Sequence, residues 1–187
     1  MTEETYLILD TETTGFAKSG AKVQEGQARV CQLALILTDH TGKPLTKFCS
    51  LIKPDGWKIS EGAQKVHGIT DEMCDRHGIP FLVAIELFHV LADKATVTVA
   101  HNDEFDRNML DIETEYFNSN TTKRYIGARK WFCTMRSNTH LKGGRWPKLS
   151  ETYKHYMQRD PVDAHDALVD AEACKDIFFA MKAANGW

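Results

Sequence analysis

The sequence predicts an α/β fold in which helices cover a mixed sheet of five strands. Three apolar segments come first and are separated by polar or glycine-containing stretches, which is typical of neighbouring strands. Segments with apolar residues at three- and four-residue steps follow, as amphipathic helices require. Two further short apolar segments stand between those helices and complete the sheet.

The expected strands are short and mostly apolar. The first, residues 6–9, ends at Asp10, and the second covers residues 30–37. A turn that contains glycine and proline is expected at residues 39–44, so that residues 45–52 return as an antiparallel third strand. The fourth and fifth expected strands are residues 96–100 and 131–133.

The expected helices carry start signals or an apolar face. Ser60 and Thr70 are typical N-cap residues, and Pro80 suits the start of a third helix. The helices are expected at residues 60–68, from residue 70 onward, and at residues 80–92, 105–116, 149–157 and 167–183. Residues 13–28 and 118–124 are rich in polar residues or glycine and are expected to be loops.

Length and composition favour one domain that spans residues 1–187. The chain is 42% hydrophobic and 26% charged, and it has no apolar run of about 18 residues, so that we expect no membrane segment. The N-terminus lacks the basic and apolar regions of a signal peptide, which favours a cytoplasmic location. The five cysteines form no C-x-x-C pair and are expected to be buried thiols.

The charge is unevenly distributed along the chain. The net charge is −3, but residues 123–148 contain eight Lys or Arg residues and no Asp or Glu, so that the remainder carries −11. A basic segment that also contains Tyr125, Trp131 and Trp146 suits contact with a polyanion whose bases stack on the aromatic rings. A solvated loop with Trp131 in the core explains the same composition, and both interpretations are open.

Two acidic residues follow the first expected strand. Asp10 and Glu12 are two residues apart, and a strand directs residues at this spacing to one face. Neighbouring carboxylates repel each other unless a cation lies between them, and oxygen ligands suit Mg²⁺ or Mn²⁺. A solvated pair of acids at a strand end is the alternative interpretation.

Two further segments supply acids and a histidine. Asp106 lies in the first turn of the helix after the fourth expected strand, near the sheet edge where ligands gather. Asp170 is surrounded by Leu, Val and Ala residues, so that its carboxylate requires a partner such as a metal ion. Beside such a cluster, His165 is suited to act as a general base. A helix-terminal acid and a surface histidine are the ordinary alternatives.

Three sequence motifs carry these side chains. They read Asp10-Thr11-Glu12-Thr13-Thr14-Gly15, His101-Asn102-x-x-Phe105-Asp106 and His165-x-Ala167-x-x-Asp170. In this order they resemble the motifs of the DEDDh 3′→5′ exonucleases, which include the proofreading subunit of bacterial DNA polymerase III, RNase T, oligoribonuclease and the TREX nucleases. The resemblance extends from residue 6 to about residue 180, and Val66-His67-Gly68-Ile69-Thr70 also matches a family segment.

The resemblance implies an RNase H-like fold and hydrolysis of nucleic acid from the 3′ end to nucleoside 5′-monophosphates. It implies that Asp10, Glu12 and Asp170 hold one Mg²⁺ or Mn²⁺ ion, and that Asp10 and Asp106 hold a second. Two such ions, about 4 Å apart, stabilise the attacking and leaving oxygens at phosphorus. The resemblance further implies that His165 takes a proton from the attacking water.

The resemblance also implies contacts with the terminal nucleotides. The matching residues are Thr13, Thr14, Gly15, His67, Asn102 and Phe105. Two departures from the family pattern bear on these contacts. The loop at residues 13–28 is long for the family, and Asp103 stands where a small residue is common, which adds negative charge near the phosphate path.

Several functions remain to be distinguished at this point. The leading hypothesis is a 3′→5′ exonuclease of single-stranded ends, with DNA favoured, in proofreading or repair and with a separate DNA polymerase as partner. The alternatives are an RNA-processing exoribonuclease of the same family, an endonuclease of the same broad fold, and a non-catalytic module that binds nucleic acid or a polymerase. The sequence does not predict the oligomeric state.

Overall fold

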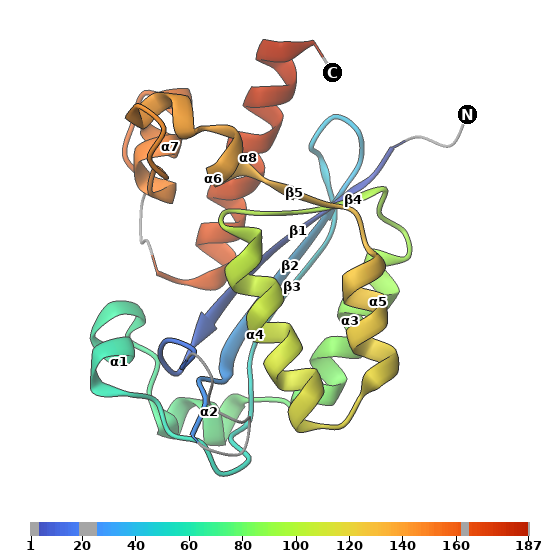
Figure 1. Cartoon of the computed structure of the whole chain (residues 1–187), viewed down its shortest axis with the longest axis vertical. Helices are drawn as coiled ribbons and strands as arrows, with labels where there is room; N and C mark the ends of the chain where they lie inside the picture. Colours follow the sequence, from blue (N-terminus) through green and yellow to red (C-terminus); the bar gives the residue numbers. More distant parts are fainter. Residues whose placement is uncertain (1–3, 19–25, 162–164, 187) are drawn as a thin grey trace.

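The computed structural model describes residues 4–18, 26–161 and 165–186, and its strands form a five-stranded sheet in the order β3-β2-β1-β4-β5 (Figure 1). The strands are β1 (Tyr6–Thr13), β2 (Val30–Thr38), β3 (Pro44–Leu51), β4 (Val97–Ala100) and β5 (Trp131–Cys133). The pairs β1–β2 and β2–β3 are antiparallel, whereas β4 runs parallel to both β1 and β5. The predicted mixed sheet is therefore confirmed.

Helices make up most of the connections between and after the strands. They are α1 (Glu61–His67), α2 (Asp71–His77), α3 (Phe81–Ala92), α4 (Asp103–Tyr116), α5 (Asn120–Ala128), α6 (Thr134–Ser137), α7 (Leu149–Met157) and α8 (Ala167–Asn185), with a 3₁₀ helix η1 at Thr139–Lys142. Ser60 and Thr70 are the N-caps of α1 and α2, and each hydroxyl accepts a backbone N–H from the first turn. Among the described helices, none has both the length and the apolar content that crossing a bilayer requires.

The loop predicted at residues 118–124 is wrong, because α5 begins at Asn120. The local sequence is polar, but Thr122 and Ile126 are buried on the inner side of this helix. Packing against the rest of the protein therefore outweighs a weak local helix propensity. The sequence patterns also missed α6 and η1, which are each only one turn long.

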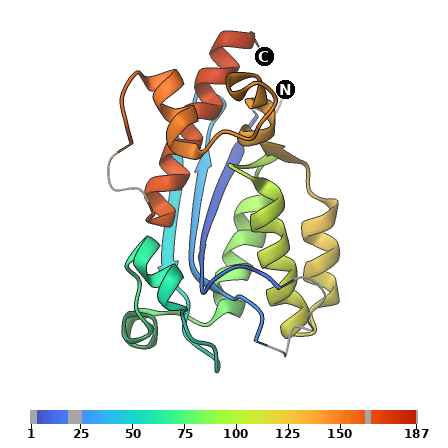
Figure 2. The same ribbon diagram turned by 60° about the vertical axis from the view of Figure 1, so that its left-hand side comes forward.

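The two faces of the sheet are covered by different helices (Figure 2). On one face α8 packs against Ile8 of β1 and Ala34 of β2. On the other face α3 and α4 pack against Leu7, Leu9 and Leu33. Successive strand residues point to opposite faces, and both faces of this sheet are covered by helices. Residues 6–9 of β1 are therefore apolar at every position, and the even-numbered ones face α8.

β1 extends beyond its neighbour β4. Their parallel pairing ends at Ile8 and Val99, whereas β1 remains paired with β2 up to Thr13. The sequence predicted that the first strand ends at Asp10. Continued pairing with β2 explains why β1 instead extends to Thr13. The last residues of β1 consequently have an open edge on the β4 side, and α4 begins next to this edge (Figure 1).

Candidate active site

The end of β1 supplies the first two acidic side chains. Asp10 and Glu12 are even-numbered, so that they belong to the same face of β1 as Ile8, the face covered by α8. In β2 they lie opposite Ala34 and Gln32. The two carboxylates therefore project side by side from one strand, toward the start of the last helix.

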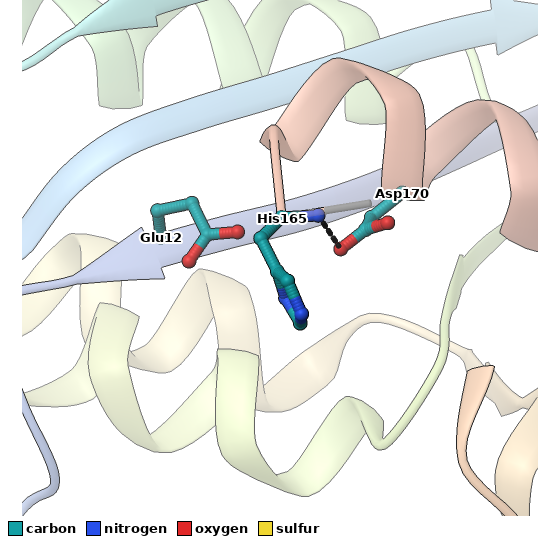
Figure 3. A group of neighbouring side chains, drawn as sticks. All are labelled: Glu12, His165 and Asp170. Carbon is teal, nitrogen blue, oxygen red and sulfur yellow. Dashed lines mark hydrogen bonds between the residues drawn. The ribbon is translucent and has the colours of Figure 1, made fainter. Parts of the chain in front are cut away.

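The N-terminus of α8 brings two more side chains to Glu12 (Figure 3). One ligand atom from each of Glu12, His165 and Asp170 lies within 4.8 Å of the other two. The backbone N–H of His165 donates a hydrogen bond to Asp170 Oδ2 at 3.3 Å. His165 is exposed and has a φ of 77°, a left-handed conformation that is unfavourable for a residue with a side chain.

Asp106 reaches the site from α4, beside the open edge of β1. It is only 2% exposed, and its Oδ1 accepts a hydrogen bond from Thr11 Oγ1 at 2.8 Å. The chain turns sharply between β4 and α4 at Asn102, which has a φ of 73°. This turn directs the first turns of α4 along the part of β1 that β4 leaves unpaired.

The four carboxylates all have pKa values above the usual range. Burial holds the pKa of Asp10 well above its ordinary value, and the charges of Asp106, Asp170 and Glu12 add to the effect. Burial, followed by the charge of Asp170, raises the pKa of Glu12 to about 7. Burial also raises the pKa values of Asp106 and Asp170, although hydrogen bonds from Thr11 and from the His165 N–H oppose the shift.

This donor set fits a divalent cation. The charged neighbours that raise the pKa values of the four carboxylates are other acidic side chains, Asp103 and Asp166 among them. Buried carboxylates that repel one another are stabilised when a cation binds between them, since its charge favours the ionised form. Carboxylate oxygens are also the ligands that hard divalent ions prefer.

Four of the six predicted substrate contacts, those at Thr13, Thr14, Gly15 and His67, have hydrogen-bond partners inside the protein. Thr13 Oγ1 donates to the Gly15 carbonyl, and Thr14 Oγ1 accepts the Arg29 N–H. His67 Nε2 donates to the Thr13 carbonyl at 3.2 Å, while its Nδ1 accepts a backbone N–H at 3.0 Å. These side chains fix the segment that follows β1, and Gly15, with a φ of 156°, lies in the same segment.

The other two predicted contacts, Asn102 and Phe105, line a groove of about 980 Å³. The groove extends from these residues along α4 to Glu115, and Lys18 and Trp146 lie on its walls. Trp146 is 63% exposed, which is unusual for so large an aromatic side chain. None of the four carboxylates lines the groove, but Phe105 and Arg107, the chain neighbours of Asp106, do.

The basic segment at residues 123–148 is divided among α5, β5, α6, η1 and the residues that precede α7. Arg129 donates to two backbone carbonyls near the end of α3. Trp131 is half-buried and stacks on Phe88, and the ring of Tyr125 packs against Phe88 as well. Of the three aromatic residues expected to stack bases, only Trp146 is largely exposed.

The charge of Asp103 is compensated within the protein. Asp103 is 1% exposed, and its Oδ1 lies 2.5 Å from a guanidinium nitrogen of Arg136. Arg107 also approaches its carboxylate, at 3.9 Å. Asp103 is thus buried beside two guanidinium groups, but its charge still raises the pKa of neighbouring Asp106. Its effect on the substrate path stays a prediction. The loop at residues 13–28, which was expected to be long for the family, includes residues 19–25, and these lie outside the described residues.

The sequence analysis missed three residues that hold this arrangement together. Thr11 binds Asp106, as described above, and Gln32 bonds to Asp166 at the N-terminus of α8. Gln32 carries a detectable signal, since it is the one polar residue inside the apolar run of β2, and a buried amide requires partners. Thr11 and Asp166 stand in polar surroundings, where nothing in the sequence distinguishes them.

Relatives match nearly the whole chain. The Exonuclease family model (RNase_T) matches residues 7–178. The DNA polymerase III subunit epsilon of Pasteurella multocida (strain Pm70) is 28% identical over 182 residues, which cover 94% of this chain and 67% of that subunit. The epsilon subunit of Escherichia coli (strain K12) is 26% identical over 186 residues, which cover 94% of this chain and 70% of that subunit. The chain thus spans about two thirds of these relatives.

Solved structures share the fold. Exonuclease X in complex with 5′ overhanging duplex DNA has a TM-score of 0.69 and 23% identity, and the match covers 97% of this chain and 93% of that one. E. coli exonuclease I in complex with a dT13 oligonucleotide has a TM-score of 0.75 and 20% identity, over 98% of this chain and 42% of that one. The nuclease domain of 3′hExo, a DEDDh family member bound to rAMP, has a TM-score of 0.75 and 16% identity, over 99% and 94%. The predicted RNase H-like fold is confirmed.

Proposed function

The chain belongs to the exonuclease family, and on this premise we propose that residues 1–187 act as one domain that shortens single-stranded DNA. As a 3′→5′ exonuclease of the DEDDh type, it removes nucleotides from the 3′ end. The proposed products are nucleoside 5′-monophosphates. The observation that supports this function best is the meeting of Glu12, His165 and Asp170, from opposite ends of the chain, within 4.8 Å.

The carboxylates are the proposed metal ligands. Asp10 and Glu12 project from β1 toward the start of α8, α8 carries Asp170 in its first turn, and Asp106 approaches from α4. Exonucleases of the DEDDh family use divalent metal ions, and we propose Mg²⁺ or Mn²⁺, two per site, for this chain. When bound, such ions stabilise the charge that develops on the attacking and leaving oxygens at phosphorus.

His165 is the proposed general base. Its ring is exposed to solvent and lies next to the carboxylates of Glu12 and Asp170, so that it can accept a proton from a water molecule that attacks the phosphate. The hydrogen bond from its backbone N–H to Asp170 keeps the base and a proposed metal ligand at a fixed separation.

The groove along α4 is the proposed path for the strand behind its 3′ end. Asn102 and Phe105 immediately precede the helical turn of Asp106, so that a strand in the groove would lead to the carboxylates. Trp146 offers an exposed ring on which a base can stack. Arg107, Arg136 and Lys18 on the walls can contact phosphates, although acidic groups also line the groove.

DNA is the favoured substrate because the polymerase subunits named above are 26–28% identical to this chain over most of its length. For the same reason a DNA polymerase is the proposed partner, in proofreading or repair. RNA processing is the alternative within the same family, and the outcome of one assay distinguishes the two.

The test is digestion of 5′-labelled single-stranded DNA and of RNA with the same sequence, in the presence of Mg²⁺ or of EDTA. We expect DNA products that shorten one nucleotide at a time with Mg²⁺ and no products with EDTA. Cutting of a single-stranded circle would indicate an endonuclease, and preference for RNA would indicate an exoribonuclease. Binding of both nucleic acids without hydrolysis in Mg²⁺ or Mn²⁺ would indicate a non-catalytic module.

A further inference from the structure

A buried amide joins the central sheet to the first residues of α8. Gln32 is 7% exposed, and its Nε2 donates to Asp166 Oδ2 at 2.9 Å. Its Oε1 accepts the Ala167 N–H at 3.0 Å. The second oxygen of Asp166 accepts two backbone N–H groups of the first turn of α8, so that Asp166 is also the N-cap of this helix.

These contacts lie between the two halves of the proposed active site. Gln32 is the partner of Glu12 in the pairing of β1 with β2. Asp166 directly follows His165 and begins the helix that carries Asp170. The amide of Gln32 therefore connects the strand next to one proposed ligand with the helix that holds another.

The conformation of His165 explains why such a connection is needed. Its φ of 77° is unfavourable for a residue with a Cβ and persists only where the surrounding structure holds it. On its C-terminal side, the hydrogen bonds of Asp166 and Gln32 fix the next two residues to β2. The Asp170 carboxylate accepts the N–H of His165 itself.

We propose that Gln32 and Asp166 are positioning residues that hold His165 and Asp170 opposite Glu12. The proposal rests on the proposed function, since it assigns a purpose to the neighbours of the general base. Both oxygens of Asp166 already accept N–H groups, which distinguishes it from the four proposed ligands. Partners of this kind, which orient ligands without contacting the metal, typically contribute about 10–100-fold to activity or metal affinity.

Exchange of the two functional groups tests this pair. Gln32→Glu places a carboxylate against the carboxylate of Asp166. Asp166→Asn replaces the oxygen that accepts from Gln32 Nε2 with an NH₂ group, so that two donors face each other. In the double variant, the carboxylate introduced at position 32 accepts from both the amide introduced at position 166 and the Ala167 N–H, so that every hydrogen bond can form again. The double variant also has the net charge of the wild-type protein. Gln64→Glu on exposed α1 is the matched control.

We expect each single variant to lower kcat by about 10–100-fold with little change in KM, because the proposed strand path lies along α4. The double variant should return to within about threefold of the wild-type kcat, and Gln64→Glu should match the wild type. A purely electrostatic role predicts opposite effects of the two single variants, since one adds a negative charge and the other removes one. That result would overturn the proposal, as would a double variant no better than either single one.

A second measurement keeps this test independent of the proposed function. The backbone amide resonances of His165 and Ala167 should shift in each single variant and return in the double variant, whether or not the protein cuts nucleic acid. Resonances that stay unchanged, or a fall in Tm with kcat and these resonances unaltered, would contradict the positioning role. Inactivity of the wild-type protein on every nucleic acid would instead refute the proposed function alone.

Discussion

Two regions of this protein bury carboxylates, and they do so in opposite ways. Glu113 on α4 is fully buried and faces Arg29 through two hydrogen bonds, at 2.8 and 2.9 Å. The same guanidinium contacts Asp55 and lies 3.7 Å from the centre of the Tyr116 ring. In the carboxylate cluster of Asp10, Glu12, Asp106 and Asp170, by contrast, the neighbouring charges of the described residues are mainly those of other acids.

The difference separates an ion pair that stabilises the fold from a cluster that opposes it. Burial raises the pKa of Glu113, but Arg29 counteracts the shift, and the Val30 N–H donates to the same carboxylate. For Asp10, by contrast, the main charged neighbours are acids, and they reinforce the effect of burial. Buried like charges reduce stability, so that their presence at one sheet edge indicates a function that requires a cation.

The largest expected effect is that of Asp10→Asn. This change removes a proposed metal ligand and should reduce exonuclease activity by about three orders of magnitude or more, since metal stabilisation is worth several kcal/mol. Tm in the absence of metal should stay the same or rise, because one of the repelling charges is lost. Activity assays and thermal unfolding measure the two effects, and Asp75→Asn, on exposed α2, is the control. A lower Tm would show that Asp10 stabilises the fold.

His165→Ala should lower kcat by ~10²–10⁴-fold, the usual contribution of a general base. KM should change little, because the proposed strand path lies along α4 and not at His165. Single-turnover rates at saturating single-stranded DNA provide the measurement, with His77→Ala at the exposed end of α2 as control. An unchanged kcat would show that His165 is not the general base.

Glu113→Ala tests the compensated region. It leaves the buried Arg29 guanidinium without its main partner and should lower the free energy of unfolding by about 3–5 kcal/mol. The folded fraction should retain the wild-type kcat. Urea unfolding is the measurement, and Glu115→Ala is the control on the same helix, because its exposed pair with Lys123 is worth at most about 1 kcal/mol. Equal losses in the two variants would contradict the structural role of the buried pair.

The smallest expected effect is a pH-dependent gain in stability on addition of metal. A folded-state pKa of about 7 for Glu12 favours folding below the ordinary carboxyl pKa, and this contribution is lost as pH rises toward and past 7. Mg²⁺ should therefore raise Tm more at about pH 8 than at about pH 5. At about 100 times Kd, the corresponding gain in the free energy of unfolding is ~3 kcal/mol.

Thermal unfolding in Mg²⁺ or EDTA at the two pH values measures this gain. Asp10→Asn should abolish most of it, whereas a conservative change far from the cluster, such as Gln64→Glu, should leave it intact. A gain of equal size at both pH values would indicate that the ion binds elsewhere on the protein.

Local patterns predicted most of the fold correctly. The apolar strands and the capped helices α1 and α2 were predictable because their signals, short apolar runs and N-cap residues, act within a few residues. The helix α5 was not, since its polar sequence forms a helix only when Thr122 and Ile126 pack inward. The basic segment at residues 123–148 shows the same limit, because a cluster in sequence became several separate contacts in space.

The sequence by itself determined the residue types of the carboxylate cluster and their order in three motifs, because metal chemistry restricts the side chains that can serve. Only the tertiary structure decided how those motifs meet. The open edge of β1 arises because β4 is shorter, and the left-handed turn at His165 is held by Gln32, more than a hundred residues away. Such contacts depend on which strands pair and where each pairing stops, and no local pattern encodes that information.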